Sequence, residues 1–449
     1  MRLVLGGYMQ ELAQPATFDV YFYQASGKDH RAYAFKLKQA VGTWAAGTPV
    51  LIVKRDKDGS AQGVTPLVNA NATLTPGVDG DGANQFHMLV DSNCTAAPGG
   101  VSPAVDVQSA GFICNATQQR FAHVGMSDVE PAMIQQPING GSSLSTASLN
   151  ANSVAQGIFG VAVSKSLYLA LQKAQGLVDI SASGIDEDAT KQPSIPAGFV
   201  RTALTGKASG SLSTLVGWNI LIPSSVDAAV NTKQVNVCRR TANSGTQAAS
   251  NMYFAANPCA GADNYIPSTG TKVGSVLGTV DQVIKKDGRT GYFEGSSTQV
   301  VESCLGTTAE GLGAYALGII GRENNPRPTV NGVKQDKGYR FVKLNGVAPE
   351  RANVIDTSYD FVFEASMQWR DSGVNAPAAD VLAFITDMRN NMGKASVLQK
   401  LDGDLQAGLV ATPNSYAGAW ANLSADDKLF SARASRVKSN SCTPIRMSK

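Results

Sequence analysis

The stretch CRRTANSGTQAASNMYF, residues 238–254, sets the main expectation for the fold. It overlaps KQVNVCRR (233–240), whose apolar residues predict a strand, and a helical pattern follows at once. A strand that turns into a helix leaves the first N–H groups of the helix without partners, beside the positive end of the helix dipole. The stretch therefore predicts either an anion site or an ordinary helix start capped by Asn243 or Ser244.

Four residues of this stretch have the chemistry that an oxyanion needs. Ser244 and Thr246 offer hydroxyl donors, and Gly245 allows the backbone to approach a ligand closely. Arg240 can donate two parallel hydrogen bonds to an oxyanion. Together they are candidate ligand-binding residues.

Two other strand patterns also end in short polar side chains. The run TPVLIVKR (48–55) predicts a strand, and Ser60 follows it in a glycine-containing turn. The segment HVGMSDVEPAMI (123–134) places Ser127 and Asp128 in a second turn. Because the carboxyl ends of parallel strands meet at one edge of a sheet, we expect the three turns to converge on one cleft.

The rest of the chain alternates strand and helix patterns. Further strands are expected before residue 5 and at residues 158–163, 216–223, 313–320 and 354–369, and a helix is expected after 163. Residues 69–85 and 257–274 are rich in turn formers and predict long surface excursions. The pattern indicates an α/β protein with mixed, mostly parallel sheets, flanking helices and long loop insertions.

Composition excludes several classes of function. The 449 residues are 43% apolar and 16% charged, with a net charge of +3, which gives no case for binding nucleic acid. No apolar run reaches the roughly 18 residues of a membrane span.

The segment MRLVLGGYMQ does not read as a signal peptide, so for an exported protein the signal is expected to have been removed. Three isolated histidines and the absence of hydrolase or metalloprotease motifs predict no enzyme, no metal site and no cofactor.

Six cysteines without a C-x-x-C motif favour disulfides over zinc. They are Cys94, Cys114, Cys238, Cys259, Cys304 and Cys442. Pairing of neighbours along the chain favours Cys94–Cys114 and Cys238–Cys259, which leaves Cys304 to pair with Cys442. Six cysteines nevertheless allow about 15 connectivities. Disulfides indicate an oxidising compartment, whereas six buried thiols are the alternative.

The chain resembles the PstS-like phosphate-binding proteins in an ordered set of short motifs. These are GSAQGV, GMSDVEP, IFGVAVSK, TALTGKASGSLSTLVGW, CRRTANSGTQAA, VESCL and GAYALGII, which run from about residue 48 to residue 370. The resemblance is to the longer, cysteine-containing bacterial branch. It implies a type II periplasmic-binding-protein fold, in which two α/β lobes close over an oxyanion, and a periplasmic or extracellular protein that serves an ABC permease.

Carried over to this sequence, the resemblance implies that Ser60, Asp128 and Arg240 bind the ligand, together with the helix start at Ser244, Gly245 and Thr246. The acidic Asp128 would accept a hydrogen bond from protonated phosphate and repel sulfate. One lobe is expected to comprise residues 1–157 and 356–449, and the other residues 158–355.

An alternative prediction is a structural protein on the same scaffold. Tyr8 and Met9 stand where the family has a hydroxyl-rich ligand loop, and Ala242 stands where it has an acidic residue near the arginine. In this reading, strand addition between subunits would build an extracellular filament or matrix.

Overall fold

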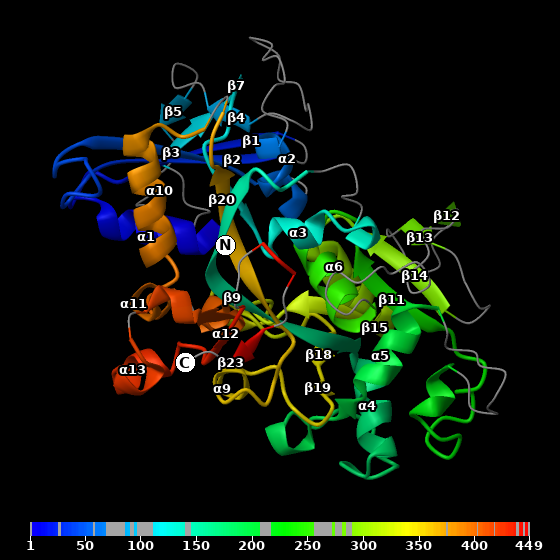
Figure 1. Ribbon diagram of the computed structural model, residues 1–449. Coiled ribbons are helices and arrows are strands. Elements are labelled where there is room, and N and C mark those ends of the chain that lie inside the picture. The colour runs from blue at the N-terminus through cyan, green and yellow to red at the C-terminus, as the bar shows by residue number, and fades with distance from the viewer. Residues whose placement is uncertain are drawn as a thin grey trace.

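The structure is a computed structural model of the chain, and Figure 1 shows its course. It describes residues 2–25, 28–56, 59–68, 86–89, 94–96, 111–139, 145–206, 217–255, 272–273, 281–283, 290–373, 376–401, 403–416, 418–436, 440–442 and 445–447. Helices and strands of the described ranges form a mixed α/β protein, which confirms the expected fold class. The predicted excursion at 69–85 lies outside these ranges, and so does that at 257–274 except for 272–273.

Among the described residues, the larger sheet contains ten strands. Its main path runs through β12 (Lys272–Val273), β13 (Asp281–Val283), β14 (Thr290–Gly295), β11 (Val235–Arg240), β15 (Ala316–Gly321), β9 (Leu149–Ser164), β20 (Val362–Arg370) and β8 (Gly125–Ser127). Two further strands, β18 (Tyr339–Phe341) and β21 (Leu409–Ala411), also pair with β9. Strand β11 is parallel to β14 and β15, but β9 and β20 pair antiparallel with their neighbours, so parallel pairing is less common than expected.

Strand β9 joins two regions of the molecule. Residues 149–158 pair with β20, and residues 159–163 pair with β15. The largest hydrophobic cluster surrounds the second half of β9 and includes Val161, Leu171 and Val237. Another cluster contains Val154 from the first half of β9. The division into two lobes near residue 158 stays a prediction, because the largest cluster also contains Val129, Met133 and Phe361, which lie outside residues 158–355.

A five-stranded sheet covers the other end of the molecule. Its order is β3 (Pro49–Asp56), β2 (Lys28–Lys36), β1 (Asp19–Ala25), β6 (Phe112–Cys114) and β5 (Cys94–Ala96). Four short pairs complete the strands: β4 (Phe86–Leu89) with β7 (Thr117–Arg120), β10 (Ser194–Ile195) with β19 (Lys343–Leu344), β16 (Thr329–Val330) with β17 (Val333–Lys334), and β22 (Ala434–Ser435) with β23 (Arg446–Met447).

The helices flank these sheets. They are α1 (Arg2–Leu12), α2 (Thr65–Val68), α3 (Pro131–Ile134), α4 (Lys165–Ala174), α5 (Ala197–Leu204), α6 (Gly245–Ser250), α7 (Thr298–Ser303), α8 (Ala309–Gly311), α9 (Arg351–Ile355), α10 (Ala379–Asn391), α11 (Ala395–Leu398), α12 (Gly403–Gly408) and α13 (Ala425–Lys428). In Figure 1, α1 and α10 lie together beside the smaller sheet, although they come from opposite ends of the chain. The Tyr8 hydroxyl donates to the Asp387 carboxylate between them.

The N-terminal segment was expected to be a strand, and this expectation is wrong. It forms α1, because its apolar side chains recur at helical spacing and one face of the helix enters the core. The buried positions on this face are Val4, Leu5, Tyr8, Met9 and Leu12. Tyr8 and Met9 are therefore core residues, and neither lines the cleft described below.

Most other expected strands are present. Those at 48–55, 158–163, 233–240, 313–320 and 354–369 correspond to β3, β9, β11, β15 and β20, and α4 follows β9 as expected. The prediction of a strand at 216–223 is wrong, since Gly217–Ile220 form a 3-10 turn. Gly217 has a φ of 57°, and the indole of Trp218 is fully buried there. Burial of this side chain overrides the local preference for a strand.

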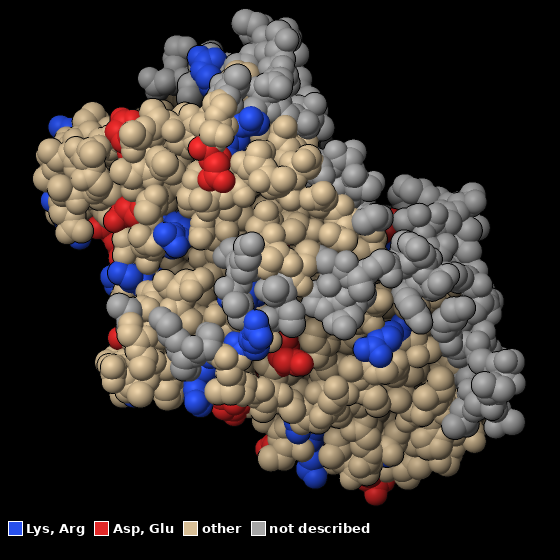
Figure 2. All heavy atoms as spheres, viewed as in Figure 1, with Lys and Arg blue, Asp and Glu red and all other residues tan. Residues whose placement is uncertain are grey.

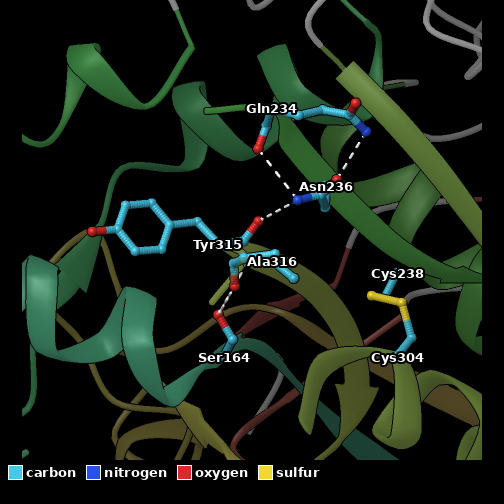
Figure 3. Close-up of a disulfide and its surroundings, with 8 residues drawn as sticks. Ser164, Gln234, Asn236, Cys238, Cys304, Tyr315 and Ala316 are labelled. Atoms are coloured by element: carbon cyan, nitrogen blue, oxygen red, sulfur yellow. Dashed lines mark hydrogen bonds between the residues drawn. A yellow bond between two sulfur atoms is a disulfide. The ribbon is translucent and has the colours of Figure 1, made fainter. Parts of the chain in front are cut away.

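The disulfides are partly as expected. Cys94 and Cys114 are bonded, which confirms the first pair. The other two expected pairs are wrong, because Cys238 of β11 is bonded to Cys304, in the helical turn after α7 (Figure 3). Cys442 is also disulfide-bonded, and Cys259 lies outside the described residues. Helix α7 packs against β11, which brings together cysteines that are 66 residues apart.

Buried polar contacts hold the strands around this disulfide (Figure 3). The Asn236 side chain on β11 donates to the Tyr315 carbonyl at 2.8 Å. The backbone N–H of Ala316 donates to the Ser164 hydroxyl at 3.2 Å. These bonds link the starts of β11 and β15 to the end of β9, at the end of these strands opposite to Arg240.

Surface charge is sparse. Figure 2 shows lysine, arginine, aspartate and glutamate side chains scattered over the described part of one face, without a large patch of one sign. None of the described helices has the length and apolar character needed to span a bilayer.

Candidate functional site

The turns after β3 and β8 are bound to each other. The Ser60 hydroxyl donates to Oδ2 of Asp128 at 2.9 Å and accepts the backbone N–H of Asp128 at 3.1 Å. Ser60 begins a 3-10 turn, Ser60–Gly63, and is buried. Two of the predicted ligand residues, 68 positions apart, are therefore in direct contact.

The turn between β11 and α6 packs against the same place. Asn243 has a φ of 71°, a left-handed conformation that asparagine tolerates. Its carbonyl accepts the backbone N–H of Ala61 at 3.1 Å. Ser244 is the N-cap of α6, and its hydroxyl accepts the backbone N–H of Gln247 at 3.5 Å. The helix start predicted from the sequence is thus present, with Ser244 rather than Asn243 as its cap.

Gly245 lies at the point where the three turns meet. A Cβ atom added to Gly245 would be 2.3 Å from Oγ of Ser60 and 2.8 Å from Oδ2 of Asp128. No side chain fits into this space without displacing one of these groups. The absence of a side chain therefore lets the start of α6 approach the Ser60–Asp128 pair.

Arg240 ends β11 beside these turns. Its Nε donates to the Gly295 carbonyl at 3.3 Å, and its two terminal nitrogens donate to the Ser296 carbonyl at 2.9 Å and the Thr298 hydroxyl at 3.3 Å. A guanidinium has five N–H groups, so these three bonds leave donor capacity for a ligand. Burial lowers the pKa of Arg240, and the negative charge of Asp128 opposes that effect.

Two cavities meet at Asp128, Arg240 and Thr298. The larger cavity has a volume of about 490 Å³, and its wall also includes Ser60, Ser127 and residues 296–297. The smaller cavity has a volume of about 200 Å³ and is lined in addition by Thr246 and Glu323. The structure therefore brings all of the predicted ligand residues to one region, where hydroxyls, a guanidinium and carboxyls meet.

The predicted residues differ in their accessibility to a ligand. Asp128 and Arg240 line both cavities, Ser60 and Ser127 line the larger one, and Thr246 lines the smaller one. Ser127 is nearly fully buried, and its hydroxyl accepts the backbone N–H of Val129 at 3.4 Å. Ser244 and Gly245 line neither cavity and act on the site through the position of α6.

Sequence reasoning missed the polar groups that follow β14 and β15. Ser297 is the N-cap of α7 and accepts the Val300 N–H at 3.3 Å, and Thr298 bonds to Arg240. The run GSSTQVV shows the same strand–turn–helix signal as the opening stretch, so it was detectable from the sequence.

Glu323 follows β15, and nothing in the local sequence marks it as a site residue. Its carboxyl lines the smaller cavity, and burial of the carboxyl raises its pKa, with a further increase from the charge of Asp128. Within the described part of the chain, no group of three or more histidine, cysteine, aspartate or glutamate side chains is arranged to hold a metal ion.

Comparisons with known proteins give partial structural similarity only. No protein-family model and no curated protein matches the chain. A structure from Clostridium perfringens, assigned as a phosphate ABC transporter substrate-binding protein with bound phosphate, shares 13% identity at a TM-score of 0.31, over 62% of this chain and 77% of its own.

Two other solved structures show the same degree of similarity. An ABC-type phosphate transport receptor from Vibrio cholerae has 12% identity and a TM-score of 0.29, over 59% of this chain and 74% of its own. PstS from Borrelia burgdorferi has 11% identity and a TM-score of 0.31, over 65% and 79%. Similarity at this level carries no argument about the ligand, which has to come from the residues of the cleft.

Proposed function

We propose that the protein is an extracytoplasmic, non-catalytic binding protein that captures phosphate or a similar tetrahedral oxyanion at the junction of the two cavities. The observation that carries this proposal is the convergence of Ser60, Asp128 and Arg240 with the start of α6. Hydroxyls, backbone N–H groups and a guanidinium are the donors that proteins use for oxyanions. Delivery to an ABC permease is part of the same proposal and rests on the sequence resemblance.

The charges at the junction of the two cavities favour an oxyanion that carries a proton. Arg240 is the cation that lines both cavities, and Asp128 is an acceptor that a protonated phosphate oxygen could satisfy. A fully deprotonated anion such as sulfate would place its oxygens against the Asp128 carboxylate without a proton between them, which is unfavourable.

The proposal is tested by isothermal titration calorimetry with phosphate and with sulfate. Arg240→Ala removes a charge-assisted hydrogen bond and should weaken phosphate binding by about 1.5–3 kcal/mol, or ten- to a hundredfold. Asp128→Asn should reduce the preference for phosphate over sulfate more than it weakens phosphate binding. Arg327→Ala, at a half-exposed ion pair with Glu187, is the matched control and should bind as the unmodified protein does.

Thermal unfolding of each variant separates loss of binding from loss of folding, because Arg240 also bonds residues 295–298. The proposed function is wrong if the unmodified protein binds no phosphate at about millimolar concentration, or if folded Arg240→Ala binds it equally well.

A further inference from the structure

We infer that the smaller cavity is a subsite for a short, uncharged alkyl group attached to the phosphoryl group of the ligand. The ligand class is a monoalkyl phosphate or an alkylphosphonate. This inference rests on the proposed function, because it takes the phosphoryl group to lie at the junction of the two cavities.

The wall of the smaller cavity is mostly apolar. Asp128, Arg240 and Thr298 line both cavities, and the other nine residues of this wall comprise seven apolar or glycine residues and two polar ones, Thr246 and Glu323. The apolar side chains are those of Val4, Ile158, Phe159, Ala365, Leu405 and Leu409. Such a wall offers few hydrogen-bond donors to oxygen atoms, so it favours a part of the ligand that is made of carbon.

Most of these apolar side chains are shielded from water. Val4 of α1, Ile158 of β9, Ala365 of β20 and Leu409 of β21 are each at most 7% exposed. They belong to a helix and three strands rather than to loops, so the wall has a defined shape. A carbon atom that enters this cavity leaves water, and each buried methylene should then raise the affinity about three- to fourfold.

The volume of the smaller cavity, about 200 Å³, limits the length of the alkyl group. An apolar cavity of about 150 Å³ holds one benzene-sized molecule. Because the phosphoryl group takes part of the space beside Arg240 and Thr298, roughly two or three carbon atoms fit into the remainder. Free phosphate would leave the apolar wall without a partner, and the lost contacts would weaken its binding relative to an alkylated ligand.

The charges of the smaller cavity disfavour an anionic substituent. Asp128 and Glu323 supply two carboxyls to its wall, and Arg240 supplies one guanidinium, which the phosphoryl group engages in the proposed function. A carboxylate on the substituent would therefore be buried without a cation of its own. An ammonium group would lose its hydration against the apolar wall, which is also unfavourable.

Isothermal titration calorimetry with a series of ligands tests the inference. The affinity should increase about three- to fourfold with each added methylene from methylphosphonate through ethylphosphonate to n-propylphosphonate. The last of these should bind more tightly than inorganic phosphate. 3-Phosphonopropionate, in which a carboxylate replaces the terminal methyl group, should bind at least about tenfold more weakly than n-propylphosphonate.

Ethyl phosphate distinguishes the two sources of the phosphoryl group. It has the shape of n-propylphosphonate, with an ester oxygen in place of the first methylene. Tighter binding of ethyl phosphate would assign the ligand as an ester, and tighter binding of n-propylphosphonate would assign it as a phosphonate. Either order supports the inference when both ligands bind more tightly than inorganic phosphate.

Variants of the wall test the location. Leu405→Trp narrows the cavity and should reduce the ratio of n-propylphosphonate affinity to phosphate affinity at least about fivefold. Leu312→Trp, at an exposed position outside both cavities, is the matched control and should keep the ratio. Leu405→Ala widens the cavity and should make n-pentylphosphonate bind more tightly than n-propylphosphonate. Glu323→Gln removes a carboxyl and should reduce the discrimination against 3-phosphonopropionate.

Thermal unfolding confirms that each variant is folded. The inference is wrong if phosphate binds but the affinity stays level or falls along the alkyl series, or if folded Leu405→Trp keeps the full preference for n-propylphosphonate. Tighter binding of 2-aminoethylphosphonate than of n-propylphosphonate would also overturn it, because the substituent would then be a cation. Binding of neither phosphate nor any alkylated ligand would instead overturn the proposed function itself, so the two failures are distinguishable.

Discussion

Glu364 is a buried carboxyl on β20 whose environment makes folding depend on pH. Burial raises its pKa to about 7, although the charge of Arg436 acts in the opposite direction. Its Oε1 accepts the backbone N–H of Arg436 at 3.1 Å, and Glu130 bonds the same guanidinium at 3.2 Å. The buried cluster therefore holds two carboxyls against one arginine, which favours protonation of Glu364.

The sign of the effect follows from the raised pKa. An unfolded glutamate titrates near 4.3. The stability that protonated Glu364 gives the folded protein is therefore fully present below about pH 4.3 and is lost as the pH rises to 7. The loss is on the order of 3 kcal/mol. Glu364→Gln keeps the acceptor for Arg436 and should remove this loss, so the variant should gain stability relative to the unmodified protein between pH 5 and pH 8.

Urea unfolding at pH 5, 6, 7 and 8 measures this difference. Glu350→Gln, at a partly exposed ion pair with Arg322, is the control and should show no such trend. An equal stability difference at pH 5 and pH 8 for Glu364→Gln would contradict the prediction.

Gly245 supplies a second residue-scale prediction. Gly245→Ala places a methyl group 2.3 Å from Oγ of Ser60, so the helix start and the Ser60–Asp128 pair must separate. We expect phosphate affinity to fall at least about tenfold, because several donors are displaced together. Calorimetry measures the affinity, and thermal unfolding measures the cost of overpacking, about 1–3 kcal/mol.

Gly198→Ala in α5 is the control for this change. A Cβ atom there meets nothing within 4 Å, so binding should be unchanged and stability should rise by about 0.5–1 kcal/mol. Phosphate binding that survives Gly245→Ala undiminished would show that the ligand does not depend on the position of α6.

At the scale of elements, the two described disulfides fasten different parts of the fold. Cys238–Cys304 fixes β11 to the helical segment after α7 and closes 66 residues of chain. Cys94–Cys114 joins the neighbouring strands β5 and β6 and closes 20 residues. Chain entropy alone predicts about 4 kcal/mol of stabilisation from the longer loop and about 3 kcal/mol from the shorter.

Replacing the two cysteines of each disulfide by alanine tests which disulfide stabilises the fold more. The double variant at 238 and 304 should lose more stability in urea than the double variant at 94 and 114, and its cysteines are also more deeply buried. A larger loss from the 94–114 variant would contradict the assigned importance of the β11–α7 connection.

At the scale of the whole molecule, β9 suggests how the protein could close on a ligand. Its two halves belong to different strand pairings and to different hydrophobic clusters. The turns at residues 60–61 and 243–245 are already in contact in this structure, which is therefore a closed arrangement. If the lobes are residues 1–157 with 356–449 and residues 158–355, the ligand-free protein should open in solution, and phosphate should draw the lobes together around Asp128 of one lobe and Arg240 of the other.

Spin labels at the exposed positions Gln39 and Ser183 report on this closure. Phosphate should shorten the distance between them by more than about 2 Å, as measured by pulsed electron paramagnetic resonance. A second pair at Ser183 and Asn331, both within 158–355, should not change. An unchanged distance from Gln39 to Ser183, with phosphate bound by calorimetry, would show that the lobes do not move.

The sequence by itself determined the elements with strong local patterns and several of the residues that line the two cavities. Apolar runs predicted β3, β11 and β15, because buried strands need several consecutive apolar side chains. The turns at Ser60, Asp128 and 240–246 were recognisable because glycine and short polar side chains follow those strands. We expected these turns to converge at one edge of a parallel sheet. They do converge, but from two sheets, because β3 belongs to the five-stranded sheet and β8 pairs antiparallel with β20.

Only the tertiary structure decided the features that depend on distant partners. Segment 2–12 is a helix because its apolar face packs against β2 and α10, and Cys238 pairs with Cys304 because α7 packs on β11. The sequence does not mark Glu323 as a cleft residue, and it does not show that β3 and β8 end their sheets at one cavity. Local propensity fixes a strand or a turn, but burial and edge pairing are set by contacts between segments that are far apart in the chain.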